Sequence, residues 1–354
     1  MNIQRIRRMT NITNINIREL SNLPSPEFYQ KKFPSSEQQT SLIKESRKTI
    51  ENIIEGKDSR LLLLMGPCSI HDTKAGIEYA EKLKELAEKV SKNIYIVMRV
   101  YFEKPRTTVG WKGLINDPDL NGSYNIPKGI EIAREFLSEV TRIGLPTATE
   151  FLDPFTPQYI GDLVSWGAIG ARTAESQTHR QMASGLSMPI GFKNGTGGSV
   201  QLAIDGMIAC NGEHAFLGID DDGKTSIVIT KGNKANHVIL RGGASGPNYD
   251  KDSINEAQEL LKKNNLEPNI VVDCSHGNSN KDHNRQPIVF KEILDQRING
   301  NDKIIGIMLE SNINPGSQSL GNIEDLEYGV SITDKCVGWE KTEEIIIEAN
   351  NLLN

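Results

Sequence analysis

A chain of 354 residues with 37% hydrophobic and 24% charged residues has the composition of a globular protein, which excludes a disordered or fibrous chain. Its formal net charge of −6 argues against nucleic-acid partners, and no apolar stretch approaches the roughly 18 residues that span a membrane. Because the chain shows no secretory h-region and its four cysteines are scattered, we expect a cytoplasmic protein without membrane partners.

Residues 1–59 are polar and contain no strong strand pattern. The spacing of apolar residues predicts a helix over 41–54. Everything before this helix is interpreted as an extended arm, which is either disordered or ordered by packing on a neighbouring subunit. We therefore assign 1–59 to an N-terminal arm and helix with a role in oligomer contacts and regulation, and 60–354 to the main domain.

From residue 60 onwards, short apolar runs alternate with amphipathic stretches. The runs span 60–69, 94–102, 146–151, 168–174, 189–196, 237–243, 269–277 and 303–311. Two of the intervening stretches show one apolar helical face each, from Ile77 to Val90 and from Ile132 to Ile143, and Gly144 ends the second. Buried strands that alternate with helices indicate a parallel sheet, and eight such units fit an α/β fold of the (β/α)8 barrel type, about 250 residues in size.

Two features modify this prediction. The strand-like runs 214–220 and 224–230 flank Asp222-Gly223, a hairpin turn signal, so we expect a β-hairpin inserted at about 211–233. An open doubly wound sheet is the structural alternative. The glycines at 195–198 lack the G-x-G-x-x-G spacing of a dinucleotide site, so that alternative has little support.

Chemically capable residues stand at the ends of all eight runs. In a barrel of this type the active site is built at the carboxyl ends of the strands. One charged residue there usually marks only the point where a strand meets water, but eight in succession call for another explanation. These residues are Cys68, Arg99, Glu150, Arg172, Lys193, Arg241, Asp273 with His276, and Glu310.

Six cations of this net-acidic chain are expected at the same face of the barrel. They are Arg99, Lys104, Arg106, Arg172, Lys193 and Arg241. Cations gathered away from water repel one another, so their clustering predicts a ligand with several anionic groups. Arginine suits bidentate binding of phosphate and carboxylate, and neighbouring glycines allow backbone N–H groups to approach phosphate oxygens. The pattern favours small phosphorylated and carboxylated substrates.

The remaining strand-end residues suggest a metal site. The first, seventh and eighth strands become neighbours when the barrel closes, and Asp334 follows the eighth. A thiolate, an imidazole and two carboxylates suit one divalent Mn, Fe, Co or Zn ion. The candidate ligands are Cys68, His276, Glu310 and Asp334. The alternative is that Cys68 is only a small buried hydrophobic residue, as single cysteines often are.

Several motifs together resemble the type I 3-deoxy-D-arabino-heptulosonate 7-phosphate (DAHP) synthases, in particular the subgroup with an N-terminal arm and an inserted hairpin. They cover nearly the whole chain in the order of the family: GPCSIHD, KPRTTVGWKG, ARTAESQTHR, GFKNGTGG, HVILRGG, DCSHGNSNKDH and MLESNINPGSQ. The related octulosonate 8-phosphate synthases carry an Ala-Asn-Arg-Ser type motif where this chain has Lys104-Pro105-Arg106-Thr107. The resemblance therefore implies erythrose 4-phosphate rather than arabinose 5-phosphate as the aldehyde.

The resemblance also implies roles for individual residues. Cys68, His276, Glu310 and Asp334 would hold the metal. Phosphoenolpyruvate would be bound by Arg99, Lys104, Arg172, Lys193 and Arg241, with Glu150 near the attacking water. Arg106 and Thr107 would bind the phosphate of erythrose 4-phosphate. Lys104 is the candidate proton donor to the developing alkoxide, with His276 as the alternative.

Regulation and assembly follow from the same resemblance. In this subgroup the arm and hairpin form a pocket in which an aromatic amino acid inhibits the enzyme, and the expected assembly is a homodimer or homotetramer. Gly218, where phenylalanine-sensitive relatives tend to have serine, favours tyrosine as the inhibitor. The alternative is that the hairpin only contacts another subunit. One departure, Ala244 in RGGASG, puts in doubt a cation contact beyond Arg241. A non-catalytic sensor of phosphorylated metabolites remains the rival from another class.

Overall fold

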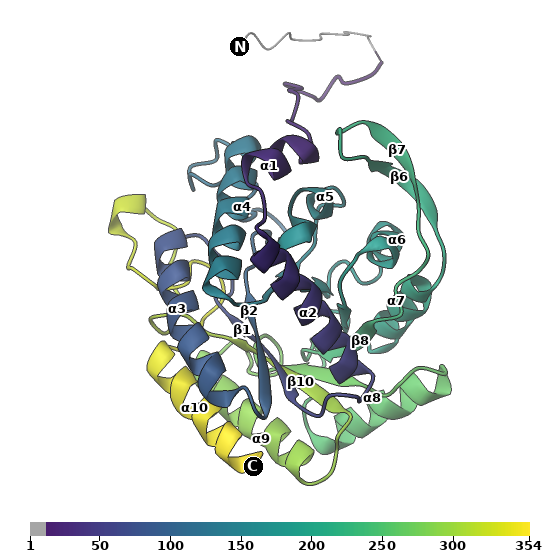
Figure 1. Ribbon diagram of the computed structural model, residues 1–354, viewed down its shortest axis with the longest axis vertical. Helices are drawn as coiled ribbons and strands as arrows, with labels where there is room; N and C mark the ends of the chain where they lie inside the picture. Colours follow the sequence, from purple (N-terminus) through teal and green to yellow (C-terminus); the bar gives the residue numbers. More distant parts are fainter. Residues whose placement is uncertain (1–11) are drawn as a thin grey trace.

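The computed structural model describes residues 12–354, and its centre is a closed barrel of eight parallel strands (Figure 1). The strands are β1 (Leu61–Gly66), β2 (Ile94–Arg99), β3 (Thr147–Glu150), β4 (Trp166–Ile169), β5 (Ile190–Lys193), β8 (Asn236–Leu240), β9 (Ile270–Asp273) and β10 (Ile304–Glu310). β1 pairs with β2 on one side and with β10 on the other, which closes the sheet. The predicted (β/α)8 barrel is confirmed.

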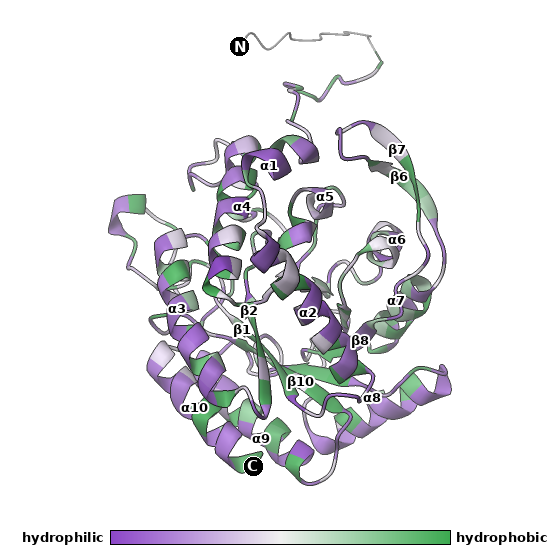
Figure 2. Ribbon diagram, in the orientation of Figure 1, coloured by the Kyte–Doolittle hydropathy of each residue, from purple (hydrophilic) through white to green (hydrophobic). Residues whose placement is uncertain are grey.

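Helices surround the barrel and alternate with its strands. They are α3 (Thr73–Val90), α4 (Ile126–Ile143), α5 (Thr156–Ile160), α6 (Gln177–Gly185), α7 (Gln201–Asn211), α8 (Lys251–Lys263), α9 (Gln286–Ile298) and α10 (Trp339–Leu352), with short 3-10 turns η1 (Gly161–Leu163), η2 (His283–Arg285) and η3 (Ile323–Asp325). The side chain of Asp72 caps the start of α3. Gly144 ends α4 at φ 94°, a conformation that glycine adopts readily. The hydrophobic faces of these helices lie against the strands, and their polar faces point outward (Figure 2).

Strand residues alternate between two apolar clusters. In β1, Leu61 and Leu63 pack outward against the helices, whereas Leu62 and Leu64 point into the barrel, where they join residues such as Trp166. All of these side chains are fully buried. Because both faces of each strand are covered, the strands appear in the sequence as continuous apolar runs rather than as alternating ones.

One strand lies earlier than expected. The sequence pattern predicted a run over 168–174, but β4 spans Trp166–Ile169. After it, the N–H groups of Thr173 and Ala174 both donate to the carbonyl oxygen of Gly170, at 3.0 and 2.9 Å. These bonds form a tight turn, so Arg172 lies on a turn beyond the strand rather than within it.

The N-terminal segment contains two helices, α1 (Pro26–Lys32) and α2 (Glu37–Ile54). The prediction of an extended arm up to residue 40 is therefore wrong for α1 and for the first turn of α2, which are helical. α2 begins four residues before its predicted start because Ser36 and Gln39 form a reciprocal capping box. Residues near the end of α2, including Ile50 and Ile53, join the apolar cluster inside the barrel. α2 thus covers the amino-terminal end of the barrel and leaves the carboxyl ends of the strands for the site.

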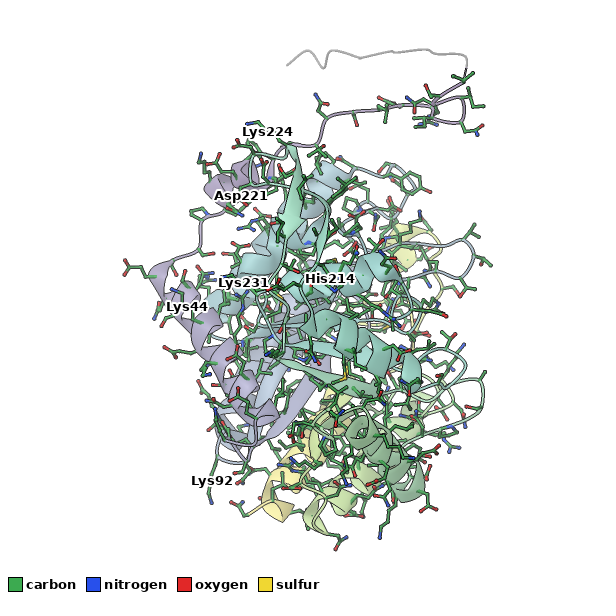
Figure 3. All side chains as sticks on the ribbon, turned by 90° about the vertical axis from the view of Figure 1, so that its right-hand side faces the viewer. Lys44, Lys92, His214, Asp221, Lys224 and Lys231 are labelled. Atoms are coloured by element: carbon green, nitrogen blue, oxygen red, sulfur yellow. The ribbon has the colours of Figure 1, made fainter. Side chains whose placement is uncertain are left out.

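The inserted β-hairpin is present between α7 and β8. Its strands β6 (Ala215–Ile219) and β7 (Thr225–Ile229) pair with each other and not with the barrel. Figure 3 shows Asp221 and Lys224 at its tip and His214 and Lys231 at its base. The N–H of Glu27, in α1, donates to the carbonyl oxygen of Asp221 at 2.9 Å, so the N-terminal segment contacts the hairpin turn. Among residues 12–354, none of the helices has the length and hydrophobicity to cross a membrane.

Candidate active site at the carboxyl ends of the strands

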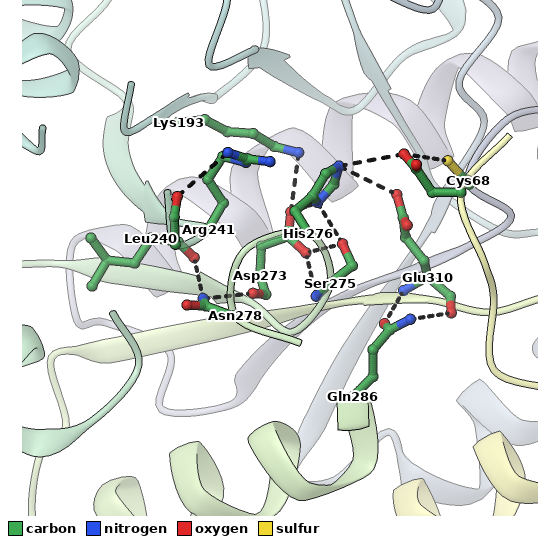
Figure 4. A network of polar contacts seen from close by, with 12 residues as sticks. Cys68, Lys193, Leu240, Arg241, Asp273, Ser275, His276, Asn278, Gln286 and Glu310 are labelled. Carbon is green, nitrogen blue, oxygen red and sulfur yellow. Dashed lines mark hydrogen bonds and ion pairs between the residues drawn. The ribbon is translucent and has the colours of Figure 1, made fainter. Parts of the chain in front are cut away.

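Most of the residues predicted at the strand ends can be seen together in Figure 4, namely Cys68, Lys193, Arg241, Asp273, His276 and Glu310. The last residues of β2, β3, β5, β9 and β10 are, in that order, Arg99, Glu150, Lys193, Asp273 and Glu310. Arg241 directly follows β8, Cys68 follows β1 by two residues, and Arg172 follows β4 by three. The barrel topology therefore accounts for the convergence of side chains that are hundreds of residues apart in sequence.

A thiol and two carboxylates form the candidate metal centre. Ligand atoms of Cys68, Glu310 and Asp334 all lie within 4.8 Å of one another. The Sγ of Cys68 is 3.6 Å from Oδ2 of Asp334. The Nε2 of His276 lies 3.9 Å from the Glu310 carboxylate and 4.0 Å from that of Asp334. Cys68, Glu310 and Asp334 therefore form one cluster, and His276 lies within 4.0 Å of its two carboxylates.

The chemistry of these groups fits a divalent cation. Burial, together with the nearby Glu310 carboxylate, raises the pKa of the Cys68 thiol to about 12. Such a thiol stays protonated at neutral pH unless a metal ion binds it, so metal binding here would release its proton. Within residues 12–354, Oε2 of Glu310 is buried and has no hydrogen-bond partner. A buried carboxylate oxygen without a partner is costly unless a ligand completes its coordination.

Surrounding residues hold these candidate ligands in place. The Nδ1 of His276 lies 2.6 Å from the hydroxyl of Ser275 and 3.1 Å from the carboxylate of Asp273, which fixes the orientation of the imidazole ring. The side chain of Gln286 accepts a hydrogen bond from the Glu310 N–H at 3.0 Å and donates to the carbonyl oxygen of Lys335, next to Asp334. Gln286 was not among the predicted site residues, because a glutamine at the start of a helix carries no sign of such a role.

Cations lie beside the acidic cluster. Arg99, which is fully buried, donates to Glu310 at 3.0 Å, and its guanidinium carbon lies 4.1 Å from the centre of the Tyr101 ring. Burial alone would lower the pKa of Arg99, but Tyr101 and Glu310 raise it, so its charge is retained. In the described part of the chain, Nε and Nη1 of Arg99 have no hydrogen-bond partner. These donors remain for an anionic ligand.

A second buried ion pair joins Lys193 to Asp273, at 3.1 Å. Although burial would raise it, the pKa of Asp273 is held well below its ordinary value by Lys193 and His276. Next to this pair, the side-chain oxygen of Asn194 accepts a hydrogen bond from the N–H of Arg241 at 2.8 Å. Asn194, another residue that the sequence analysis did not select, thereby orients the start of the loop that carries Arg241.

The loop after β2 brings further cations to the site. The Nζ of Lys104 donates to the carbonyl oxygen and to the Sγ of Cys68, at 3.2 and 3.0 Å. Burial would lower the pKa of Lys104, but Cys68 and Glu310 raise it, so the side chain is an ammonium ion at neutral pH. Farther along the loop, Arg106 is exposed, and the hydroxyl of Thr107 accepts a hydrogen bond from Nε of Arg172 at 3.1 Å. Arg172 itself belongs to the turn after β4.

The carboxylate of Glu150 packs directly against Gly170. A Cβ atom added to Gly170 would lie 2.1 Å from Oε1 of Glu150, so a larger residue at this position would require the carboxylate to move. Among the residues that the structure describes, the buried Oε1 of Glu150 and the buried hydroxyl of Tyr101 both have no hydrogen-bond partner. Two buried polar groups of this kind at the mouth of a barrel suit contact with a substrate or a water molecule.

Fold and site together define an enzyme of the (β/α)8 barrel class that acts on anionic substrates next to a metal centre. The sequence profile of the DAHP synthetase I family matches residues 32–346. The chain belongs to this family, whose members are metalloenzymes of aromatic amino acid biosynthesis. The DAHP synthase activity expected from the motifs is confirmed.

Named relatives agree with this assignment. The chain is 52% identical over 344 residues to the Tyr-sensitive phospho-2-dehydro-3-deoxyheptonate aldolase of Escherichia coli, covering 97% of this chain and 96% of the relative. It is 50% identical over 331 residues to the phenylalanine-inhibited enzyme of Saccharomyces cerevisiae, covering 92% and 89%. A solved structure of the Francisella tularensis enzyme superposes with a TM-score of 0.93 at 50% identity, covering 96% of this chain and all of that one.

Proposed function

We propose that the site at the strand ends condenses phosphoenolpyruvate with erythrose 4-phosphate and water, and releases DAHP and phosphate. The observation that carries this proposal is the contact between the cations of the site and the candidate metal ligands. Lys104 lies 3.0 Å from Cys68, and Arg99 lies 3.0 Å from Glu310. Cations that would hold an anionic substrate therefore adjoin the residues that would hold a metal.

Phosphoenolpyruvate would be bound by the inner cations. Arg99 keeps two guanidinium nitrogens for it, and Lys193 and Arg241 line the neighbouring strand ends. Arg172 and Lys104 approach from the loops after β4 and β2. Paired guanidinium donors suit both the phosphate and the carboxylate of this substrate.

Cys68, His276, Glu310 and Asp334 would hold one divalent ion, Mn, Fe, Co or Zn. When bound, such an ion supplies Lewis-acid polarisation of the aldehyde. Ser275, Asp273 and Gln286 orient these ligands through their hydrogen bonds. No further metal is required by the proposal.

The carbon–carbon bond forms between C3 of phosphoenolpyruvate and the aldehyde carbon of erythrose 4-phosphate. Lys104, charged and adjacent to Cys68, would donate a proton to the developing alkoxide. An alkoxide is a stronger base than an amine, so an ammonium group can serve as this acid even with a raised pKa. Glu150 would orient the water that adds at C2, after which phosphate leaves. His276 is the alternative proton donor.

The phosphate of erythrose 4-phosphate would be bound at the outer loop. Arg106 is exposed and its Nε donates to the carbonyl oxygen of Trp111 at 2.7 Å, which leaves its terminal nitrogens for a ligand. Thr107, bonded to Arg172, would contribute its hydroxyl. Purified protein offered erythrose 4-phosphate or arabinose 5-phosphate with phosphoenolpyruvate should release phosphate only with the former. Turnover with arabinose 5-phosphate alone would refute the choice of aldehyde.

Residues 1–59 and the hairpin at about 211–233 would form the regulatory part of the molecule, with 60–354 as the catalytic barrel. The contact between Glu27 and Asp221 supports a joint role for the arm and the hairpin. A Cβ at Gly218 would lie 2.6 Å from Cγ2 of Val228, so serine at this position would require the Val228 side chain to shift. We propose tyrosine as the inhibitor. An assay of the enzyme with each aromatic amino acid tests this, and stronger inhibition by phenylalanine would contradict it.

A homodimer or homotetramer would cover apolar side chains that a monomer exposes. In the hairpin, Leu217, Ile227 and Ile229 are each more than 70% exposed, and Ile12 and Ile15 of the arm are exposed to a similar degree. Exposed apolar patches of this kind mark protein interfaces. Light scattering should give a mass of two or four chains, and a monomer at micromolar concentration would contradict the proposal. A reducing compartment such as the cytoplasm would keep Cys68 available as a ligand.

A further inference from the structure

Glu103 is a buried carboxyl group that stands between Phe102 and Lys104 but takes no part in the clusters described above. Only 3% of its surface is exposed. Its two oxygens accept hydrogen bonds from the N–H of Asp153, at 3.1 Å, and from that of Leu152, at 3.4 Å. It therefore spans from the loop after β2 to the loop after β3.

Burial of this carboxyl group costs free energy, and its hydrogen bonds offset that cost. Burial raises the pKa of Glu103 to about 8, although the backbone hydrogen bond from Asp153 partly opposes this shift. An apolar side chain of similar size would leave the N–H groups of Leu152 and Asp153 without this acceptor, which is unfavourable. The N–H groups of Leu152 and Asp153 are therefore the feature of the structure that requires a carboxyl group at position 103.

Each of the two joined loops carries residues of the site. On one side, Glu103 precedes Lys104 directly, and the loop is closed by the bond from the Lys104 N–H to the carbonyl oxygen of Lys112, at 2.8 Å. On the other side, Leu152 follows Glu150 by two residues. Glu103 thus connects the segment of the proposed proton donor to the segment of the residue that would orient the water.

We propose that Glu103 is a positioning residue, which holds the loop of Lys104, Arg106 and Thr107 at a set distance from Glu150. The inference rests on the proposed roles of Arg106 and Thr107 in binding erythrose 4-phosphate and of Lys104 as the proton donor, and it deepens that function. Misplacing a reacting group by about 1 Å can reduce a rate on the order of a hundredfold, so a tie between two loops has a direct effect on turnover.

The test is Glu103→Gln, which keeps the shape of the side chain but places an amide nitrogen against one of the two backbone N–H groups. We expect kcat to fall by about tenfold or more and KM for erythrose 4-phosphate to rise by about fivefold or more, because the outer loop loses its anchor. KM for phosphoenolpyruvate should change less, since Arg99, Lys193 and Arg241 lie at strand ends. Mn²⁺ affinity, measured by equilibrium dialysis, should stay within about twofold.

Asp117→Asn is the matched control. Asp117 is also buried, and its carboxylate accepts hydrogen bonds from the N–H of Gly122 within the same connection between β2 and α4. This variant should lower Tm but leave both KM values unchanged. Arg106→Ala tests the proposed function separately, because it should raise KM for erythrose 4-phosphate while Glu103 remains. Absence of that effect would refute the role of Arg106 and not the role of Glu103.

Hydrogen exchange provides a second readout. The amides of Leu152 and Asp153 should exchange faster in Glu103→Gln than in the wild type, with the barrel strands unchanged. Glu103→Asp, which retains the carboxyl group but is shorter by one methylene, should show the same changes in kcat and KM, and it serves if the glutamine variant does not fold. A folded variant with wild-type kcat, wild-type KM for erythrose 4-phosphate and unchanged exchange at these amides would overturn the inference.

Discussion

The ammonium group of Lys104 lies 3.0 Å from the thiol of Cys68 and donates a hydrogen bond to it. The proposed proton donor thus contacts a proposed metal ligand, although 36 residues separate them in sequence. Both side chains are buried, and each affects the ionisation of the other, since Cys68 raises the pKa of Lys104 while Lys104 counteracts the rise at Cys68. On the proposed roles, this contact would bring the proton donor to the point where the aldehyde is polarised.

Replacement of Lys104 by methionine tests the role of the ammonium group, because methionine has a similar length and no proton to donate. We expect kcat to fall by roughly a hundredfold or more, the usual contribution of a positioned general acid. Equilibrium dialysis should show that the variant still binds Mn²⁺. A variant that retains more than half of the wild-type kcat would assign the proton donor elsewhere, with His276 as the next candidate.

Removal of the metal should abolish activity. Treatment with EDTA is expected to stop phosphate release, and Mn²⁺ should restore it. Cys68→Ser should weaken Mn²⁺ binding by about tenfold or more, because serine offers no thiolate. The affinity is read from equilibrium dialysis and from the rise in Tm on addition of Mn²⁺.

Cys210→Ser is the control for this experiment. Cys210 is also buried, but it lies in α7, and its Sγ donates to the carbonyl oxygen of Asn233. Its replacement should leave Mn²⁺ affinity unchanged. Full activity after exhaustive chelation, or equal effects of the two serine variants, would contradict the assignment of the metal site.

Gly170→Ala should disturb Glu150 without removing it. The new methyl group would lie 2.1 Å from Oε1 of Glu150, so the carboxylate must move. We expect kcat to decrease by roughly tenfold to a hundredfold as the water loses its oriented partner. Gly321→Ala is the control, since the described residues place no atom within 4 Å of a Cβ at that position. Unchanged kinetics in Gly170→Ala would show that Glu150 has no such role.

Acid should destabilise the barrel through His237. This side chain is fully buried and accepts a hydrogen bond from Nε1 of Trp166 at 3.1 Å, and burial lowers its pKa from 6.5 to about 4. Between these values the unfolded chain binds a proton that the folded chain does not, so stability declines as the pH falls from 6.5 towards 4. The contribution lost is about 3 kcal/mol at most.

His237→Gln isolates this effect, because glutamine can still accept from Trp166 but does not titrate. Urea unfolding at pH 7 and at pH 5 should show a smaller loss of unfolding free energy in the variant than in the wild type. Equal losses in the two proteins would mean that other groups, such as the buried carboxylates, account for the acid sensitivity.

The barrel could be predicted because its determinants are local. Each strand is a short run buried on both faces, and each helix has one apolar face, so the period of the sequence indicates both. The start of α2 also had a local signal in the sequence, namely the capping box of Ser36 and Gln39. The predicted start at residue 41 rested on apolar spacing alone and did not include this signal. The shift of β4 had a weaker signal, since the turn after Gly170 depends on two backbone hydrogen bonds rather than on side-chain type.

The site was predicted less completely. Topology explains why Cys68 meets Glu310, because β1 and β10 are paired once the barrel closes. The residues that support the site could not be selected in this way. Gln286 acts through the backbone of Glu310, and Glu103 through the backbone of Leu152, so neither contact is encoded by the types of the residues that it joins.

The central claim is that this site joins phosphoenolpyruvate to erythrose 4-phosphate with addition of water at C2 and departure of the phosphate together with its bridging oxygen. Phosphoenolpyruvate labelled with ¹⁸O in the C–O–P bridge tests it most directly, with the wild-type enzyme, Mn²⁺ and mass spectrometry of the products. The account predicts that inorganic phosphate is released and carries the label. Unlabelled phosphate, or no phosphate release in the presence of erythrose 4-phosphate, would contradict it.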